Sequence, residues 1–403
     1  MSKEKIIISG VGCALVDLIY KQISFDSAGF KKYASRKSGD GGLSPGHLVF
    51  TEELEKFSGH SYPEILSELV GNHAPDVLNV GGPSLVSLIF ASQILNGDDY
   101  AIRFFGMRGN DSYANKIVEM VRQTPLDISH YKTAKHKVTP FTDVFSDPGY
   151  DNGLGERTFV NNIGAAWDYT PDQLSDEFFQ SQITCFGGTA LVPQIHDNLS
   201  VLLKKAREQN CITVVNTVFD FRNQKKNPDM PWPLVSNYDD YKLIDLLILD
   251  YEEALKISGQ KSMEYAAAFF SSTQLSTFII TNGASDLIAY SNGHLFEKTG
   301  ILKYPTSDTI GEELKNNPER KGDTTGCGDN FAGGIIASLG MQLKNRNRGN
   351  FNLSEAISWG VAAGGNCCFT VGGTYHERIP GELKSRLVPI QKEFLIQIGN
   401  AKK

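Results

Sequence analysis

Apolar positions along the chain fall into short runs, and several runs precede a stretch in which apolar residues recur at helical spacing. The runs typical of strands are residues 5–12, 101–105, 183–187, 212–216, 244–249 and 277–281. The stretches typical of helices are residues 84–95, 112–122, 198–209, 251–258 and 263–271. Such alternation predicts an α/β fold, in which helices cover both faces of a mostly parallel sheet.

Other segments interrupt this alternation. Residues 21–75 are polar, and no regular pattern is predicted for them. Residues 138–166 place β-branched and aromatic positions on both sides of a turn cluster at 148–155, which predicts an inserted β-hairpin. A hairpin inserted in an α/β core is typical of a lid or dimer flap, with an ordinary surface loop as the alternative. Residues 222–240 are expected to be a surface loop. Residues 307–320 are charged and turn-rich, and we expect them to form a rim element beside a glycine-rich loop.

Composition and charge narrow the class of protein. The chain has 403 residues, 40% hydrophobic and 21% charged, which is ordinary for a globular protein with more than one small core. No apolar run is long enough for a membrane span, and no signal-peptide-like segment precedes the first strand-like run, so we expect a cytoplasmic protein. The net charge of −7 argues against a nucleic-acid or membrane partner, because both need a basic face.

The cysteines and histidines do not indicate a metal site. The six cysteines include no CxxC pair and no zinc spacing, and several lie in apolar runs, which favours reduced core thiols. The eight histidines also lack ligand spacing. The cysteines are Cys13, Cys185, Cys211, Cys327, Cys367 and Cys368.

The most distinctive segment is KGDTTGCGDNFAGGIIASL, residues 321–339. Gly326 and Gly328 allow a tight turn and a close approach of the backbone to a ligand. Helical spacing follows at once, and a helix N-terminus fed by a glycine loop suits phosphate. The segment is not a Walker loop, because no Gly-Lys-Ser/Thr follows, and the first strand is not followed by a dinucleotide fingerprint.

Asp329 is unexpected directly after a loop suited to anions. A carboxylate in the first helical turn is ordinarily a cap, and that explanation stands as the alternative. As a base, however, it would take the proton from a hydroxyl that attacks a γ-phosphoryl group. The backbone N–H groups of residues 326–328 would then stabilise the developing charge.

Residues 323–334 resemble the signature D-T-x-G-A-G-D-x-F-x-x-G of the ribokinase family, the PfkB-type carbohydrate and nucleoside kinases. Cys327 replaces an alanine, a change that a loop acting through its backbone should tolerate. The resemblance implies that Asp329 is the catalytic base. It assigns Gly326, Cys327 and Gly328 to the anion hole and Asp323 and Thr324 to the nucleotide.

Further segments resemble the same family in the same order, over nearly the whole chain. VGCALVDLI supplies Asp17, which the resemblance assigns to substrate hydroxyls, and NVGGPSLVSLIFASQIL supplies Gly81 and Gly82, on which substrate would lie. FFGMRGNDSYANKI and GERTFVNNIGAA resemble the G-x-x-G-x-D segment and the returning lid strand. The cofactor segments are LLILDYEEALKISG, which maps Asp250 and Glu253 onto the N-x-x-E magnesium motif, and IITNGASDLIAY, which maps Thr281 and Gly283 onto the nucleotide T-x-G motif.

The resemblance implies a ribokinase-like three-layer α/β/α sandwich with a small β-sheet lid. The core would comprise residues 1–17, 76–137 and 167–403, and the lid would comprise residues 18–75 and 138–166. It also implies ATP and Mg²⁺ as cofactors, and it leaves a monovalent cation such as K⁺ and a homodimer formed through the lid as open alternatives.

The chain departs from the family pattern at several positions. Val86 and Cys13 stand where relatives have asparagines, so two polar substrate contacts are missing. Asp250 replaces the asparagine of N-x-x-E, and magnesium use should survive because hard cations take oxygen ligands from either residue. Asp286 replaces a glycine after T-x-G, at the edge of the nucleotide site.

Three functions are weighed. The main expectation is an ATP-dependent kinase that phosphorylates a hydroxymethyl group of a sugar, of the ribokinase, fructokinase or 2-keto-3-deoxygluconate kinase type. The alternative is an adenosine or inosine/guanosine kinase, which GLSPGHLVFTEEL favours by its resemblance to the lid of those enzymes, whereas Cys13 and Val86 speak against it. A non-catalytic ligand-binding relative is disfavoured because Asp329 and both loop glycines are intact. Arg157 is expected to face water, with contact to an anionic substrate as the alternative. Arg222 follows a strand-like run, and a role at the ligand-binding edge of the sheet and a role in a turn are left open for it.

Overall fold

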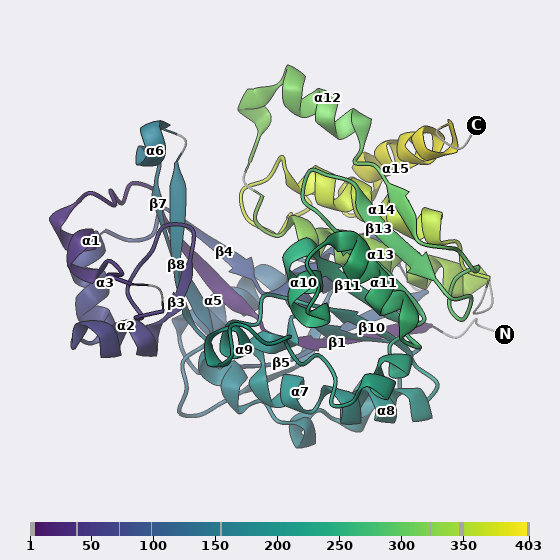
Figure 1. Ribbon diagram of the computed structural model, residues 1–403, viewed down its shortest axis with the longest axis horizontal. Helices are drawn as coiled ribbons and strands as arrows, with labels where there is room; N and C mark the ends of the chain where they lie inside the picture. Colours follow the sequence, from purple (N-terminus) through teal and green to yellow (C-terminus); the bar gives the residue numbers. More distant parts are fainter. Residues whose placement is uncertain are drawn as a thin grey trace.

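The computed structural model describes residues 5–37, 39–71, 73–97, 99–153, 155–322, 324–345 and 350–400. Within these ranges the chain forms a 9-stranded sheet and a separate 5-stranded sheet, which lie side by side (Figure 1). The large sheet has the order β14-β13-β12-β11-β10-β9-β1-β5-β6, and it is parallel except for its β13 and β14 edge. Its strands are β1 (Ile6–Gly12), β5 (Tyr100–Arg108), β6 (Asp127–Thr133), β9 (Ile183–Gly187), β10 (Ile212–Asn216), β11 (Leu246–Asp250), β12 (Thr277–Thr281), β13 (Leu287–Ser291) and β14 (Leu302–Tyr304). The predicted α/β fold with a mostly parallel sheet is confirmed.

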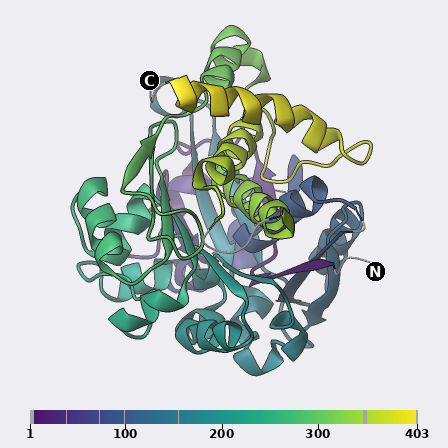
Figure 2. The ribbon, with the colours of Figure 1, turned by 90° about the vertical axis from the view of Figure 1, so that its right-hand side faces the viewer.

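The large sheet is covered on both faces, which explains why its central strands are apolar throughout. In β11, Leu246 and Ile248 pack into one core, and Leu247 and Leu249 pack into the other. Figure 2 shows the C-terminal helices, in yellow and light green, packed around this sheet. The first core takes α4 (Pro83–Ile94), α5 (Ser112–Val121), α13 (Cys327–Asn345), α14 (Leu353–Cys367) and α15 (Glu382–Asn400), and the second takes α7 (Pro193–Asp197), α8 (Leu199–Glu208), α10 (Tyr251–Ser258) and α11 (Met263–Ser272).

The small sheet has the order β3-β8-β7-β2-β4 and lies on the left in Figure 1. Its strands β7 and β8 pair antiparallel, as the hairpin expected from residues 138–166 requires. On β2, Val16 and Leu18 are buried in a core that they share with helices α1 and α3. The strands are β2 (Leu15–Tyr20), β3 (Leu48–Phe50), β4 (Val77–Gly81), β7 (Phe141–Asp147) and β8 (Glu156–Asn162), and the helices beside them are α1 (Ala28–Tyr33), α2 (Thr51–Ser58), α3 (Tyr62–Val70) and α6 (Tyr150–Gly153).

The interrupting segments contain helices that the sequence pattern did not predict. Residues 21–75 contain α1, α2 and α3, which are only 6, 8 and 9 residues long and therefore show little periodicity in the sequence. Residues 307–320 contain helix α12 (Asp308–Asn316), whose first turn is capped by Ser307. Residues 222–240 contain most of α9 (Phe221–Lys226). They also contain Trp232, whose side chain is buried, with only 3% of its surface exposed, and is not at the surface as expected for a loop residue.

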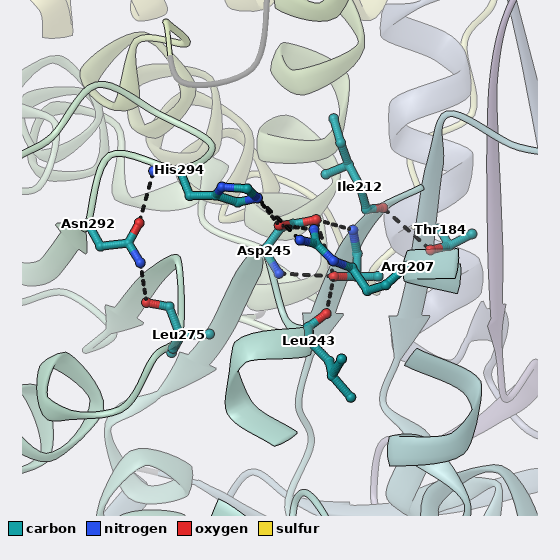
Figure 3. Close-up of polar contacts among 9 residues, drawn as sticks. Thr184, Arg207, Ile212, Leu243, Asp245, Leu275, Asn292 and His294 are labelled. Carbon is teal, nitrogen blue, oxygen red and sulfur yellow. Dashed lines mark hydrogen bonds and ion pairs between the residues drawn. The ribbon is translucent and has the colours of Figure 1, made fainter. Parts of the chain in front are cut away.

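A polar network ties the large sheet together at the N-terminal ends of its strands (Figure 3). Asp245, just before β11, is buried, and its carboxylate accepts hydrogen bonds from the Thr213 N–H at 3.0 Å and from Arg207 Nη1 at 2.5 Å. His294 Nε2 lies 3.6 Å from the same carboxylate. These residues come from β10, α8 and the turn after β13, so one buried charge holds several elements in register. None of the described helices is both long and apolar enough to cross a membrane.

Candidate active site

A cleft of about 660 Å³ lies where the small sheet faces the glycine loop. Asp17 and Asn79 line it from β2 and β4, and Arg157 lines it from β8. Lys321 and Thr325 line it from the glycine-loop side. Asp17 and the glycine loop, more than half the chain apart in sequence, therefore meet in one cavity.

Asp17 lies on a second strand that begins shortly after the first one ends. β1 ends at Gly12, and the chain then crosses to the small sheet, where Asp17 lies in the middle of β2 opposite Asn79 on β4. Because side chains alternate along a strand, Asp17 faces the cleft while Val16 and Leu18 are buried among apolar side chains.

The glycine pair predicted to carry the substrate lies against Asp17. A Cβ added to Gly81 would be 2.4 Å from Asp17 Oδ2. Gly82 has φ +102°, and a Cβ there would be 2.2 Å from the Cys13 carbonyl oxygen. Only glycine fits this second position, which is the N-cap of α4. The structure thus brings Asp17, Gly81 and Gly82 together.

The glycine loop turns sharply into the 19-residue helix α13, which begins at Cys327. Gly326 has φ +77°, and a Cβ there would be 2.4 Å from Gly373 Cα, so this position also requires glycine. A Cβ added to Gly328 would meet no atom within 4 Å. Open space therefore lies over the first turn, at the positive end of the helix dipole, where an anion is stabilised.

Asp329 lies in that first turn and is partly exposed. Loss of hydration raises the pKa of its carboxyl to about 6. Burial also raises the pKa of Glu253, and the negative charges of Asp250 and, more weakly, Asp329 raise it further. These three carboxyl groups therefore lie near enough to interact electrostatically. A base that is ionised near neutral pH, yet not strongly acidic, suits proton abstraction from an alcohol.

Asp250 and Glu253 form a reciprocal cap at the start of α10. The Glu253 N–H donates to Asp250 Oδ1 at 2.8 Å, and the Asp250 N–H donates to Glu253 Oε2 at 3.1 Å. The Thr217 hydroxyl also donates to Glu253 Oε2, at 2.5 Å. Ordinary capping thus accounts for the backbone contacts of both carboxylates. Their oxygen donors nevertheless fit Mg²⁺, which binds through one or two carboxylates, water and substrate phosphates.

No cluster of three or more His, Cys, Asp or Glu side chains suited to hold a metal ion occurs among the residues that the structure describes. The carboxylates of Asp250 and Glu253 are the groups that would hold Mg²⁺, partly through water.

The predicted nucleotide residues occupy the same edge of the large sheet, with one outside the described ranges. Thr281 pairs with Asp250 across β12 and β11, and Gly283 follows in an exposed turn with φ +55°. Thr324 is exposed beside the glycine loop. Asp323 lies outside the residues that the structure describes.

Arg157 contacts the glycine loop, against the favoured expectation that it faces water. Its Nη1 donates to Thr325 Oγ1 at 3.0 Å, and its guanidinium lies 5.7 Å from the Phe159 ring centre. The alternation of β8, which places Arg157 and Phe159 on one face, is the sequence signal that could have revealed this. Arg222, by contrast, pairs with Asp197 at 2.5 Å and lines no part of the cleft.

The sequence of residues 80–378 matches the family model described as pfkB family carbohydrate kinase. The chain belongs to this family. As a pfkB-family member it is a kinase, which transfers phosphate from ATP to an alcohol group.

The relatives of this pfkB-family chain include nucleoside and sugar kinases. An adenosine kinase of Schizosaccharomyces pombe is 25% identical over 287 residues, which are 67% of this chain and 74% of that protein. Adenosine kinase from Schistosoma mansoni in complex with 2-fluoroadenosine superposes with a TM-score of 0.68 at 16% identity, over 92% of this chain and 97% of that one. A probable sugar kinase from Rhizobium etli CFN 42 gives a TM-score of 0.66 at 15% identity, over 96% and 99%. These likenesses confirm the predicted ribokinase-like fold.

Proposed function

We propose that this pfkB-family kinase phosphorylates a nucleoside, at the hydroxymethyl group of its ribose. The main support for a nucleoside is the set of residues that line the cleft. Asp17 and Asn79 supply polar atoms, while Ile19, Val144 and Phe159 line the same cavity with apolar surface. A nucleoside has one polar part and one flat, largely apolar part, whereas a sugar is polar on all sides. This reverses the order of preference drawn from the sequence, which placed a sugar first.

The cleft is large enough to hold a nucleoside, and one further observation favours it. The cleft volume of about 660 Å³ lies within the range of roughly 300–1,000 Å³ typical of small-molecule sites. A curated relative that matches two thirds of the chain is an adenosine kinase. In the bound state, the carboxylate of Asp17 would accept hydrogen bonds from the two ribose hydroxyls, because an ionised carboxylate only accepts.

The proposed reaction uses groups on the glycine-loop side of the site. The acceptor hydroxyl oxygen forms a bond to the γ-phosphorus of ATP, the bond between that phosphorus and the bridging oxygen breaks, and ADP leaves. The proton of the hydroxyl passes to the Asp329 carboxylate, whose pKa of about 6 leaves it mostly ionised at neutral pH. The first-turn amides of α13 and the guanidinium of Arg157 stabilise charge on the transferred group. Mg²⁺, when bound, neutralises charge on the phosphates.

A sugar remains the second candidate because of two residues. Cys13 and Val86 are both buried, and neither provides the amide that relatives of the nucleoside type use at these positions. Their loss removes polar contacts to a nucleoside and leaves contacts to a simple hydroxylated ring less affected.

The experiment measures ADP release from MgATP with adenosine, inosine, ribose, fructose and 2-keto-3-deoxygluconate as acceptors. We expect kcat/KM for a nucleoside to exceed that for every sugar by at least about a hundredfold, the fold-change expected when roughly 3 kcal/mol of apolar contact is lost. A sugar that is turned over faster than both nucleosides would overturn the proposal. Binding without turnover, measured as thermal stabilisation, would instead indicate a ligand-binding relative.

A further inference from the structure

Three thiols lie close together where the glycine loop meets the end of α14, and one of them, Cys327, replaces an alanine of the family pattern. Cys327 is the first residue of α13, and Cys368 directly follows α14. Their sulfur atoms lie 3.7 Å apart. The thiol of Cys367 instead donates a hydrogen bond to the Thr325 carbonyl oxygen at 3.4 Å. All six cysteines are free thiols.

The two facing thiols differ in their surroundings. Cys327 and Cys368 are both partly exposed, whereas Cys13, Cys185 and Cys211 are buried. The hydrogen bond with Cys327 and then the positive charge of Lys321 lower the pKa of Cys368. Hydrogen bonds with the neighbouring thiols raise the pKa of Cys327. The thiol that loses its proton more readily thus lies 3.7 Å from one that retains it, the arrangement of a peroxide-sensitive cysteine and its resolving partner.

We propose that Cys368 and Cys327 form a thiol modification site, where a peroxide oxidises the pair to a disulfide that inactivates the glycine loop. The Cys368 thiolate attacks one peroxide oxygen, the O–O bond breaks, and the leaving oxygen takes up a proton to become water. The resulting sulfenic acid is attacked by the Cys327 sulfur, which loses its proton as the S–S bond forms and a second water leaves. Two thiols lose two electrons in total, and one hydrogen peroxide becomes two waters.

Formation of the disulfide would move the glycine loop out of its reduced-state position, and the close packing around the loop leaves it little room to adjust. A disulfide bond is about 2.05 Å long, so the two sulfur atoms, now 3.7 Å apart, must approach by more than 1.5 Å. The loop has little free space behind it: added Cβ atoms on Gly326 and Gly364 would lie 2.4 Å from Gly373 Cα and 3.0 Å from the Cys327 carbonyl oxygen. Misplacing a catalytic group by about 1 Å lowers the rate roughly a hundredfold. The inactivation, though not the disulfide itself, rests on the proposed phosphoryl transfer at this loop.

The test compares the full-length wild-type protein with Cys368→Ser and with Cys367→Ser as the matched control. Each reduced protein is treated with hydrogen peroxide, and its peptides are then analysed by mass spectrometry. In the wild type and in Cys367→Ser we expect a peptide pair joined through Cys327 and Cys368, lighter by two hydrogens than the reduced pair. ATP turnover in these two proteins should fall about a hundredfold and recover with dithiothreitol. Cys368→Ser should have normal basal activity and resist the peroxide.

The outcomes separate the two parts of the proposal. Absence of the joined peptide pair in the oxidised wild type overturns the site, as does equal inactivation of Cys368→Ser. A joined pair with unchanged turnover overturns the effect on the loop. The peptide measurement needs no substrate, and turnover is measured with whichever acceptor the reduced protein uses. Failure of a nucleoside as acceptor is therefore distinguishable from failure of this proposal.

Discussion

Replacing the proposed base by Asp329→Asn should abolish most of the activity and at the same time stabilise the protein. The substitution keeps the shape of the side chain but removes its ability to take a proton. Loss of a general base typically lowers the rate by about 10²–10⁴-fold. KM for the nucleoside should change little, because Asp17, on the small sheet, holds the ribose in our proposal.

The expected gain in stability follows from the pKa of Asp329. The pKa rises from an ordinary value of 3.8 to about 6 because the carboxylate loses hydration. A shift of that size corresponds to up to about 3 kcal/mol at neutral pH, since one pKa unit equals 1.36 kcal/mol. Because the folded pKa lies above the unfolded one, this penalty is absent below about pH 4, grows as the pH rises, and is complete above about pH 6. Asparagine is uncharged, so the Asn variant lacks this free-energy penalty.

The assay combines turnover with unfolding. Initial rates with MgATP give kcat and KM at pH 7.5, and urea unfolding gives the free energy of unfolding at pH 7.5 and pH 4. The Asn variant should be more stable at pH 7.5, and the difference should shrink at pH 4. In the wild type, kcat/KM should rise with pH through an apparent pKa near 6 and then level off. Glu252→Gln, an exposed carboxylate on the neighbouring helix α10, serves as the control and should change neither quantity.

Two results would refute this reasoning. Turnover of the Asn variant within tenfold of the wild type would show that another group accepts the proton. An Asn variant that is less stable than the wild type at pH 7.5 would show that the carboxylate is held by favourable contacts in the free protein, and that Asp329 acts as a structural cap.

Three further predictions concern single residues. Gly326→Ala should lower both kcat and the free energy of unfolding, the latter by about 1–3 kcal/mol because Gly326 has a φ of +77°. Gly328→Ala should leave the unfolding midpoint unchanged and raise KM for ATP. Unchanged kinetics in both variants would contradict the anion-hole assignment. Asp245→Ala should lower the free energy of unfolding by about 1–3 kcal/mol, because it leaves the buried Thr213 N–H unpaired, and kcat should stay unchanged. Urea unfolding and rate measurements check this, and a lower kcat with unchanged stability would contradict it. Arg157→Ala should lower kcat by about 10–100-fold, as expected for a lost charge-assisted contact. Arg222→Ala should have the kcat of the wild type. Equal effects of the two substitutions on kcat would argue against a role of Arg157 at the loop.

Much of the fold was predictable because its signals are local. The central strands of the large sheet are apolar at every position, since both faces are covered, and helical spacing follows them along the chain. The glycine loop was also readable, because the positive φ of Gly326 and the close approach to Gly373 permit no other residue there. Short helices such as α1 and α2 were missed, since 6 and 8 residues hold too few turns to show a period.

The tertiary structure decided which distant residues share a site. The sequence indicated Asp17 and Asp329 separately, but only the packing of the small sheet against the large one makes a single cleft that Asp17 and the glycine loop both border. The partner of Arg157 and the pairing of Cys327 with Cys368 could not be read from spacing either, because each joins segments whose separation along the chain is unrelated to their distance in space. Strands and turns follow from neighbouring residues, whereas a cleft follows from how whole elements pack together.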